Sequence, residues 1–236
     1  MSDPVLELTD VSKDYHGLRP LRISRLTVAP GEQVALVGFD QATAEVFVNL
    51  VTGASLPDRG EIRLFGRATA DISDSADWLT VVDRFGIVSR RAVLLDSLSV
   101  VQNLAMPYTL DVEPPSEEIR ARALKLAEET GLAASTLDRP VGELDATGVF
   151  CVRLARAVAL DPAVLLFEHP SADLARADVA RLASRCRAVS SGRNIAAVTV
   201  TADAEFAAAA ASRVLTLEPA SGRLTAGGWL SRFRRA

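Results

Sequence analysis

The 236-residue chain is poor in cysteine, lysine and aromatic residues, and it has no long apolar segment. Its two cysteines, Cys151 and Cys186, lack the CxxC spacing and the neighbouring histidines of a metal or redox site, so we expect buried, reduced thiols. No uncharged apolar stretch reaches the ~20 residues of a membrane span. The N-terminus has neither the basic nor the apolar region of a secretion signal, so we expect no export of this chain.

Positive charge is not in excess either. The chain has 26 Lys and Arg against 30 Asp and Glu, a net charge of −4, and this balance gives no reason to expect a nucleic-acid partner. Nearly half of the residues (49%) are hydrophobic, which is enough for a sizeable core. We predict one domain over residues 1–225 and a basic, aromatic C-terminal tail over 226–236, with Trp229, Leu230 and Phe233 among arginines.

Short apolar runs alternate with helical patterns along most of the chain. The N-terminal runs VLELTDV and LRISRLTV alternate apolar and polar residues, which predicts an antiparallel β subdomain. The later runs QVALVG, PAVLLFEHP and NIAAVTVT are apolar on both faces and are each followed by a helical pattern, which is typical of parallel strands. Residues 91–160 carry helical patterns. We therefore predict an α/β fold with a mostly parallel sheet core and a helical subdomain at about 91–160.

The stretch GFDQATAE, residues 38–45, lies between the strand EQVALV and a helix expected from about Thr43 to Val51. A glycine-opened loop between a strand and a helix has the position of a phosphate-binding loop. The lysine, the second glycine and the hydroxyl residue of such a loop are absent. This stretch therefore has the position of a phosphate site without its chemistry.

The order of segments resembles one family, the ATPase subunits of ATP-binding-cassette (ABC) membrane transporters. The segments that carry the resemblance, from Val5 to about Leu224, are LELTDVSKDY, PGEQVALVG, LVTGASLPDRGEIRLFG, LSVVQNLAMP, RLARAVALDPAVLLFEHPSADL and SRVLTLE. The resemblance implies a P-loop NTPase-like fold. It also implies a head-to-tail cassette dimer and a groove near residues 90–107 that docks a short helix of the transmembrane partner.

The resemblance assigns Gly38, Thr43, Ala44 and Glu45 to the family's phosphate loop (Walker A), and Tyr15 to its adenine-stacking position. Ala44 replaces the lysine, and Glu45 replaces the hydroxyl residue that holds Mg²⁺. Repulsion between Glu45 and phosphates should cost several kcal/mol in a partly dry cleft, against roughly 1 kcal/mol per charge from the helix N-terminus. Tyr15 could also be an ordinary surface or edge-strand tyrosine.

The remaining catalytic positions also differ from the family pattern. Glu168 stands at the Walker B aspartate and His169 at the catalytic glutamate, while Arg90 and Ala202 stand at the Q-loop glutamine and the switch histidine. The family's LSGGQ signature aligns with Leu144, Asp145, Ala146, Thr147 and Gly148. Arg90 and Arg91 could hold an anion in place of the missing lysine, but we favour solvated loop arginines.

We therefore expect a non-catalytic ABC-type subunit that is peripheral at the cytoplasmic face of a membrane, with no catalytic residue and no metal site. Its expected partners are a transmembrane permease and a second ABC ATPase subunit or a copy of itself, and no nucleic acid. No cofactor is expected, and ATP with Mg²⁺ would matter only if the degenerate site still binds it. Two alternatives stay open: a regulatory or ligand-binding module, and a residual ATPase with Glu168 as metal ligand and His169 as base.

Overall fold

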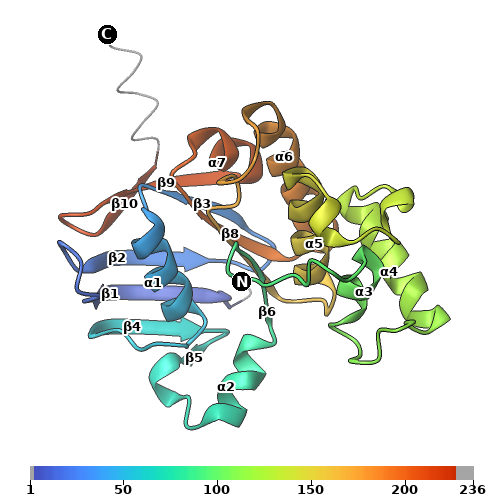
Figure 1. Cartoon of the computed structure of the whole chain (residues 1–236). Helices are drawn as coiled ribbons and strands as arrows, with labels where there is room; N and C mark the ends of the chain where they lie inside the picture. Colours follow the sequence, from blue (N-terminus) through green and yellow to red (C-terminus); the bar gives the residue numbers. More distant parts are fainter. Residues whose placement is uncertain (1–2, 227–236) are drawn as a thin grey trace.

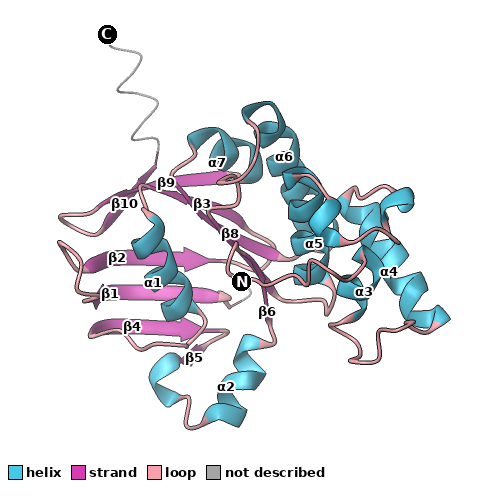
Figure 2. Ribbon diagram, viewed as in Figure 1, coloured by secondary structure: helices cyan, strands magenta, loops and turns pink. Residues whose placement is uncertain are grey.

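The computed structural model describes residues 3–226. The tail predicted for residues 226–236 therefore lies outside the described residues, apart from Ala226. The predicted fold class is confirmed: two sheets and a set of helices form an α/β architecture (Figure 2). None of the helices within residues 3–226 is long and apolar enough to cross a bilayer.

The first sheet is antiparallel and has the strand order β2-β1-β4-β5. Its strands are β1 (Leu6–Lys13), β2 (Leu21–Val28), β4 (Arg59–Leu64) and β5 (Arg67–Ala68). Buried residues recur at every second position of β1 and β2 apart from one three-residue step in each strand, as expected for strands with one face on a core. This sheet is the predicted N-terminal β subdomain.

The second sheet has the order β10-β9-β3-β8-β7-β6, and all its pairs except β10–β9 are parallel. Its strands are β3 (Gln33–Val37), β6 (Phe85–Val88), β7 (Val164–Glu168), β8 (Ala196–Thr201), β9 (Arg213–Glu218) and β10 (Arg223–Ala226). Every residue of β3, β7 and β8 is buried, as expected for central parallel strands that are covered on both faces.

The helices pack on the second sheet, between the two sheets and beside the first sheet (Figure 1). They are α1 (Gln41–Val51), α2 (Ser75–Val82), α3 (Val100–Ala105), α4 (Glu117–Thr130), α5 (Ala146–Val158), α6 (Arg176–Gly192) and α7 (Ala204–Ala210). Three single 3₁₀ turns lie at Thr69–Asp71, Ala134–Thr136 and Val141–Glu143. Helices α3, α4 and α5 fall within 91–160, where we predicted a helical subdomain; its boundaries stay a prediction.

Two large apolar clusters hold these layers together. One joins α1 to both sheets, with Phe47 and Leu50 of the helix packed among residues such as Leu6, Ile62 and Leu166. The other joins α3, α4, α5 and α6 to the opposite face of the parallel sheet. Helix α1 is thus wedged between the sheets, and its N-terminus is fixed beside the carboxyl ends of β3 and β7.

Candidate functional site

Several of the predicted site residues lie at or just after the carboxyl ends of strands of the parallel sheet. Gly38 follows β3, Arg90 follows β6, Glu168 is the last residue of β7 and Ala202 follows β8. The carboxyl ends of parallel strands meet at one edge of a sheet, which is where ligands bind in open α/β folds. The fold therefore places these positions along one edge, and hydrogen bonds and ion pairs show which side chains meet.

The predicted phosphate loop is largely helical. Helix α1 begins at Gln41, two residues before the predicted start at Thr43, because Asp40 caps it. The Asp40 carboxylate accepts hydrogen bonds from the Thr43 backbone N–H (2.8 Å) and the Thr43 hydroxyl (2.7 Å), and the Asp40 N–H donates to that hydroxyl (3.0 Å). The hydrogen bond from the Thr43 N–H lowers the pKa of Asp40 the most, and the one from the Thr43 hydroxyl lowers it further. A carboxylate of the chain itself thus occupies the anion position at this helix N-terminus.

The two positions after Thr43 have different surroundings. Ala44, at the lysine position, is completely buried and belongs to the apolar cluster around α1. Glu45, at the position of the metal-binding hydroxyl, is 46% exposed and accepts a hydrogen bond from Nη1 of Arg91 (3.3 Å). We call the region of Asp40, Glu45, Arg91 and Glu168 the cleft. The helical backbone therefore points the lysine position into the core and leaves a negative charge toward the cleft.

Glu168 has a full set of partners within the protein. Its side chain is 1% exposed. Oε1 accepts a hydrogen bond from the Gln41 side-chain amide (2.9 Å), and Oε2 accepts hydrogen bonds from the Ser89 hydroxyl (3.1 Å) and from Nε (3.1 Å) and Nη2 (2.7 Å) of Arg91. The cation that this buried carboxylate contacts is a guanidinium.

Arg91 therefore contacts two of the candidate site positions, which our sequence interpretation did not predict. We favoured solvated loop arginines and gave the Q-loop position to Arg90, whereas Arg91 contacts both Glu168 and Glu45. Arg90 instead pairs with Asp173 (3.1 Å), in the loop after β7. The expectation of solvation fails for Arg91 because β6 and β7 are adjacent, which brings the residue after one strand onto the carboxylate that ends the other.

His169 has a left-handed backbone conformation (φ 43°), and its N–H donates to the carbonyl of Val200 (2.9 Å). Its Nε2 atom is buried and has no hydrogen-bond partner within residues 3–226. Together with Arg153, Asp173 and Phe150 it lines a cavity of about 20 Å³, room for a single water molecule. A buried Nε2 atom beside a cavity of this size gives no support to a role of His169 as a catalytic base.

The signature positions form a second self-capped helix start. Asp145 is the N-cap of α5, and its carboxylate accepts a hydrogen bond from the Gly148 N–H (2.7 Å). Ala146, Thr147 and Gly148 are the first residues of α5, and Leu144 ends the preceding turn. Next to Ala202, Asp203 caps α7 through the N–H groups of Glu205 (3.0 Å) and Phe206 (3.2 Å). At the starts of α1, α5 and α7, an aspartate carboxylate thus accepts hydrogen bonds from backbone N–H groups.

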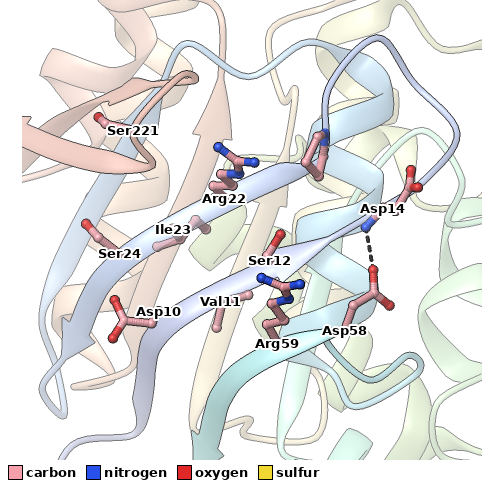
Figure 3. Close-up of a pocket in the computed structure, with 11 residues that line it drawn as sticks. Asp10, Val11, Ser12, Asp14, Arg22, Ile23, Ser24, Asp58, Arg59 and Ser221 are labelled. Atoms are coloured by element: carbon pink, nitrogen blue, oxygen red, sulfur yellow. Dashed lines mark hydrogen bonds between the residues drawn. The ribbon is translucent and has the colours of Figure 1, made fainter.

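Two open pockets lie on the side of the antiparallel sheet. One has a volume of about 320 Å³. Its lining includes the predicted positions Tyr15, Gly38 and Thr43 and the helix cap Asp40. The other, of about 480 Å³, lies over β1 and β2 (Figure 3). Asp58, in this second pocket, already accepts hydrogen bonds from Lys13 (3.0 Å) and the Asp14 N–H (2.6 Å), and none of the predicted site residues lines it.

Mg²⁺ and ATP are the groups that the resemblance implies, and the residues present do not fit them. Asp40 fills the helix N-terminus where phosphate would sit, and Arg91 fills the space between Glu45 and Glu168. Within residues 3–226 there is no group of three or more His, Cys, Asp or Glu side chains arranged to hold a metal ion. The charged groups of the cleft thus find their partners within the chain itself.

No family model matches the chain. Among curated proteins it is 34% identical over 178 residues to the lipoprotein-releasing system ATP-binding protein LolD of Maricaulis maris, covering 74% of this chain and 77% of LolD. It is also 34% identical over 180 residues to the pyoverdine export ATP-binding/permease protein PvdT of Pseudomonas entomophila, and 26% identical over 217 residues to the methionine import ATP-binding protein MetN of Brucella abortus. The chain spans 27% of the length of PvdT and 58% of that of MetN.

Solved structures show the same fold. The dimeric structure of MJ0796, a bacterial ABC transporter cassette, superposes with a TM-score of 0.75 at 21% identity over 93% of this chain and 96% of the other. The structure of cbiO1 from Clostridium perfringens, part of the ABC transporter complex cbiONQ, gives a TM-score of 0.81 at 20% identity over 99% of this chain and 92% of the other. Together with the similarity to LolD over three quarters of both chains, this means that the chain belongs to the ATP-binding subunits of ABC transporters.

Proposed function

We propose that this chain is a non-catalytic subunit of an ABC transporter complex, which acts by docking to a transmembrane permease and to a second cassette rather than by hydrolysing ATP. In this proposal the chain lies at the cytoplasmic face of the membrane and binds neither ATP nor Mg²⁺. The relatives LolD and MetN are described as ATP-binding proteins of transport systems, which supports the transporter setting but not ATP binding by this chain.

The start of α1 carries the proposal. A phosphate loop needs several free backbone N–H groups and a lysine that reaches the phosphates. Here the chain is helical from Gln41, Asp40 accepts the N–H of Thr43, and the lysine position, Ala44, is buried in the core. A nucleotide would have to displace a carboxylate and then face Glu45 as well. Both changes are unfavourable because like charges repel strongly in a partly dry cleft.

The start of α5 supports the same conclusion for the other half of a composite site. In a working cassette dimer the signature of one chain contacts the phosphates bound by the other, as the family resemblance implies. In this chain Asp145 caps α5 and presents a carboxylate there. Completing a nucleotide site of a second cassette is thus disfavoured, and a second cassette would serve as a structural partner.

An apolar groove supports docking to a permease. It has a volume of about 420 Å³ and lies where the resemblance places the permease contact, and its lining includes Ala92, Leu94, Met106, Pro107 and Leu160. Leu160 is 58% exposed, although it is a large apolar side chain. An amphipathic helix of a membrane partner would bury these side chains, and Arg153 and Arg156 also belong to the lining.

The alternative of a ligand-binding or regulatory module draws on one observation, the 320 Å³ pocket beside Tyr15. Apolar residues (Leu18, Leu21, Leu217) and charged ones (Arg19, Asp40) line it, a mixture that is typical of small-molecule sites. The alternative of a residual ATPase rests on Glu168 and His169. It predicts ATP turnover that disappears in His169→Ala, and a chain with no turnover excludes it.

The test of lost nucleotide chemistry is a calorimetric titration of the purified chain with Mg-ATP at physiological salt, with ADP and metal-free ATP as parallel titrations. The proposal predicts no binding heat at millimolar nucleotide. Binding in the micromolar range would show that α1 can reorganise to accept phosphate, and the proposal would then be wrong.

The test of docking is site-directed cross-linking in membranes that contain the co-expressed permease. Leu160→Cys places a thiol in the groove, and Leu18→Cys places one on a fully exposed loop residue outside it. The native thiols do not interfere because both are buried, and burial raises the pKa of Cys151 to about 11 and that of Cys186 well above its usual range. We expect a cross-link to the permease from Leu160→Cys alone. Equal cross-linking from both positions, or none from Leu160→Cys, contradicts docking at this groove.

A further inference from the structure

The carboxylate of Glu168 and the guanidinium of Arg91 form the best-satisfied charged contact in the cleft. Glu168 is almost completely buried, and each of its oxygens accepts at least one hydrogen bond from the protein. Arg91 donates to Oε2 through both Nε (3.1 Å) and Nη2 (2.7 Å). A buried carboxylate with this set of donors has no need of a further cation.

The same guanidinium reaches a second carboxylate. Nη1 of Arg91 lies 3.3 Å from Oε1 of Glu45, on the first turns of α1. Glu45 and Glu168 stand at the two protein positions that hold Mg²⁺ in P-loop NTPases, the residue after the lysine and the end of the Walker B strand. Arg91 thus bridges the two positions that a metal ion bridges in a working relative.

We propose that the Arg91 guanidinium is the resident cation of this cleft, and that it fixes the loop at residues 89–94 in one arrangement without metal or nucleotide. The inference builds on the proposed loss of ATP chemistry but depends on different residues. An arginine suits this place because its planar fork can contact two carboxylates at once and stays charged at every physiological pH.

The loop that Arg91 fixes is also a wall of the apolar groove. Ala92 and Leu94 line the groove, and Nη1 of Arg156, on α5, donates to the carbonyl of Val93 (2.6 Å). The Arg91 N–H donates to the Ser89 hydroxyl (3.1 Å), which tightens the turn. One side of the loop is therefore held in the cleft and the other faces the groove. The shape of the groove is then set by Arg91 and does not respond to ATP.

The experiment compares the full-length chain with Arg91→Met, which keeps the length of the side chain and removes its charge. Arg90→Met is the matched control, because Arg90 is adjacent and pairs with the exposed Asp173. Two quantities are measured: calorimetric binding of Mn²⁺ alone, and amide hydrogen exchange across residues 89–94.

We expect the wild-type chain and Arg90→Met to take up no Mn²⁺ at submillimolar concentration. Arg91→Met frees Glu45 and Glu168 and should bind Mn²⁺ at least about tenfold more tightly than the wild type. Amide exchange across residues 89–94 should accelerate by at least about tenfold in Arg91→Met and stay within about threefold of the wild type in Arg90→Met. Mn²⁺ should restore part of the lost protection.

Wild-type Mn²⁺ binding as tight as that of Arg91→Met, or unchanged exchange in Arg91→Met, overturns the inference. If Arg91→Met fails to fold, the double variant Arg91→Met/Glu168→Gln removes the unpaired buried charge and should fold, without binding Mn²⁺. A double variant that also fails to fold overturns the inference too. The proposed function fails separately, through Mg-ATP binding by the wild-type chain, so the two failures are distinguishable.

Discussion

The cleft at the ends of β3 and β7 and the apolar groove beside α5 share the loop at residues 89–94 and satisfy their surfaces in opposite ways. In the cleft, Glu168, Glu45 and Asp40 each have a partner in the same chain. In the groove, Leu160 is 58% exposed and Leu94 is only partly buried. The cleft resembles the inside of a folded protein, whereas the groove resembles half of an interface. This difference supports the function proposed above, in which the chain acts through the groove and does not take up a nucleotide in the cleft.

The largest effect on stability should come from the strand that separates the two regions. A Cβ at Gly86, on β6, would lie 2.1 Å from the carbonyl oxygen of Ala157 on α5, and backbone cannot move aside as a side chain can. Gly86→Ala should therefore lower the free energy of unfolding by about 3 kcal/mol and deform the groove. Gly192→Ala, at the end of α6 where a Cβ meets nothing within 4 Å, is the control and should not lower it; a gain of up to about 1 kcal/mol is expected. Urea unfolding measures both, and equal midpoints for Gly86→Ala and the wild type would contradict the close packing.

The cleft should respond next. Arg91→Met leaves the buried carboxylate of Glu168 without its cation, which should reduce the unfolding free energy by about 2–3 kcal/mol. This is less than the roughly 3–5 kcal/mol of a fully buried pair, because the Arg91 side chain is 40% exposed. Arg90→Met removes an exposed pair and should change it by less than about 0.5 kcal/mol. Urea unfolding of both variants at neutral pH decides between a resident cation and a solvated arginine, and equal losses would favour the second.

A smaller effect is expected at the start of α1. Asp40→Ala removes the cap and should reduce the unfolding free energy by about 1 kcal/mol at neutral pH. The pKa of Asp40 is lowered in the folded state, so its contribution is full above the ordinary value of 3.8 and is lost as pH falls below it. The advantage of the wild type over Asp40→Ala should thus shrink on acidification through that value. Asp40→Asn keeps an acceptor but does not titrate. If the difference in unfolding free energy between the wild type and Asp40→Asn did not change with pH, the role of the charge would be contradicted.

The smallest effect on stability is expected in the groove. Leu160→Arg changes a side chain that is already more than half exposed, so the unfolding free energy should move by less than about 0.5 kcal/mol. Permease binding, measured as co-purification with the co-expressed partner, should be lost because a charge would be buried in an apolar contact. Leu18→Arg is the matched surface control and should keep binding. A folded Leu160→Arg chain that still co-purifies with the permease would contradict the role of the groove.

The sequence alone was enough for the fold class, and it also contained the signal that places several candidate positions at one edge of the sheet. The runs that became β3, β7 and β8 are apolar on both faces, which indicates parallel strands, and residues that follow such strands must gather at one edge. The cap by Asp40 was also within reach, because an aspartate three residues before a threonine and a helical pattern is a capping signal. Alignment with a phosphate loop hid it and moved the expected helix start to Thr43.

The pair between Arg91 and Glu168 was beyond local sequence signals. The two residues are 77 positions apart, and they meet because β6 is the neighbour of β7 in the sheet. Strand order is set by the packing of all the layers, not by the residues near Arg91. The choice between Arg90 and Arg91, two identical side chains in consecutive positions, depends on which of them points toward the cleft when the chain leaves β6.

A crystal structure of the full chain grown with millimolar Mg-ATP tests the central claim most directly, because it shows both the start of α1 and the partner of Glu168. The account predicts a cleft without nucleotide, with α1 beginning at Gln41 under the Asp40 cap and the Arg91 guanidinium on Glu168 and Glu45. A nucleotide at the N-terminus of α1, with Arg91 displaced and a metal ion on Glu168, would contradict it.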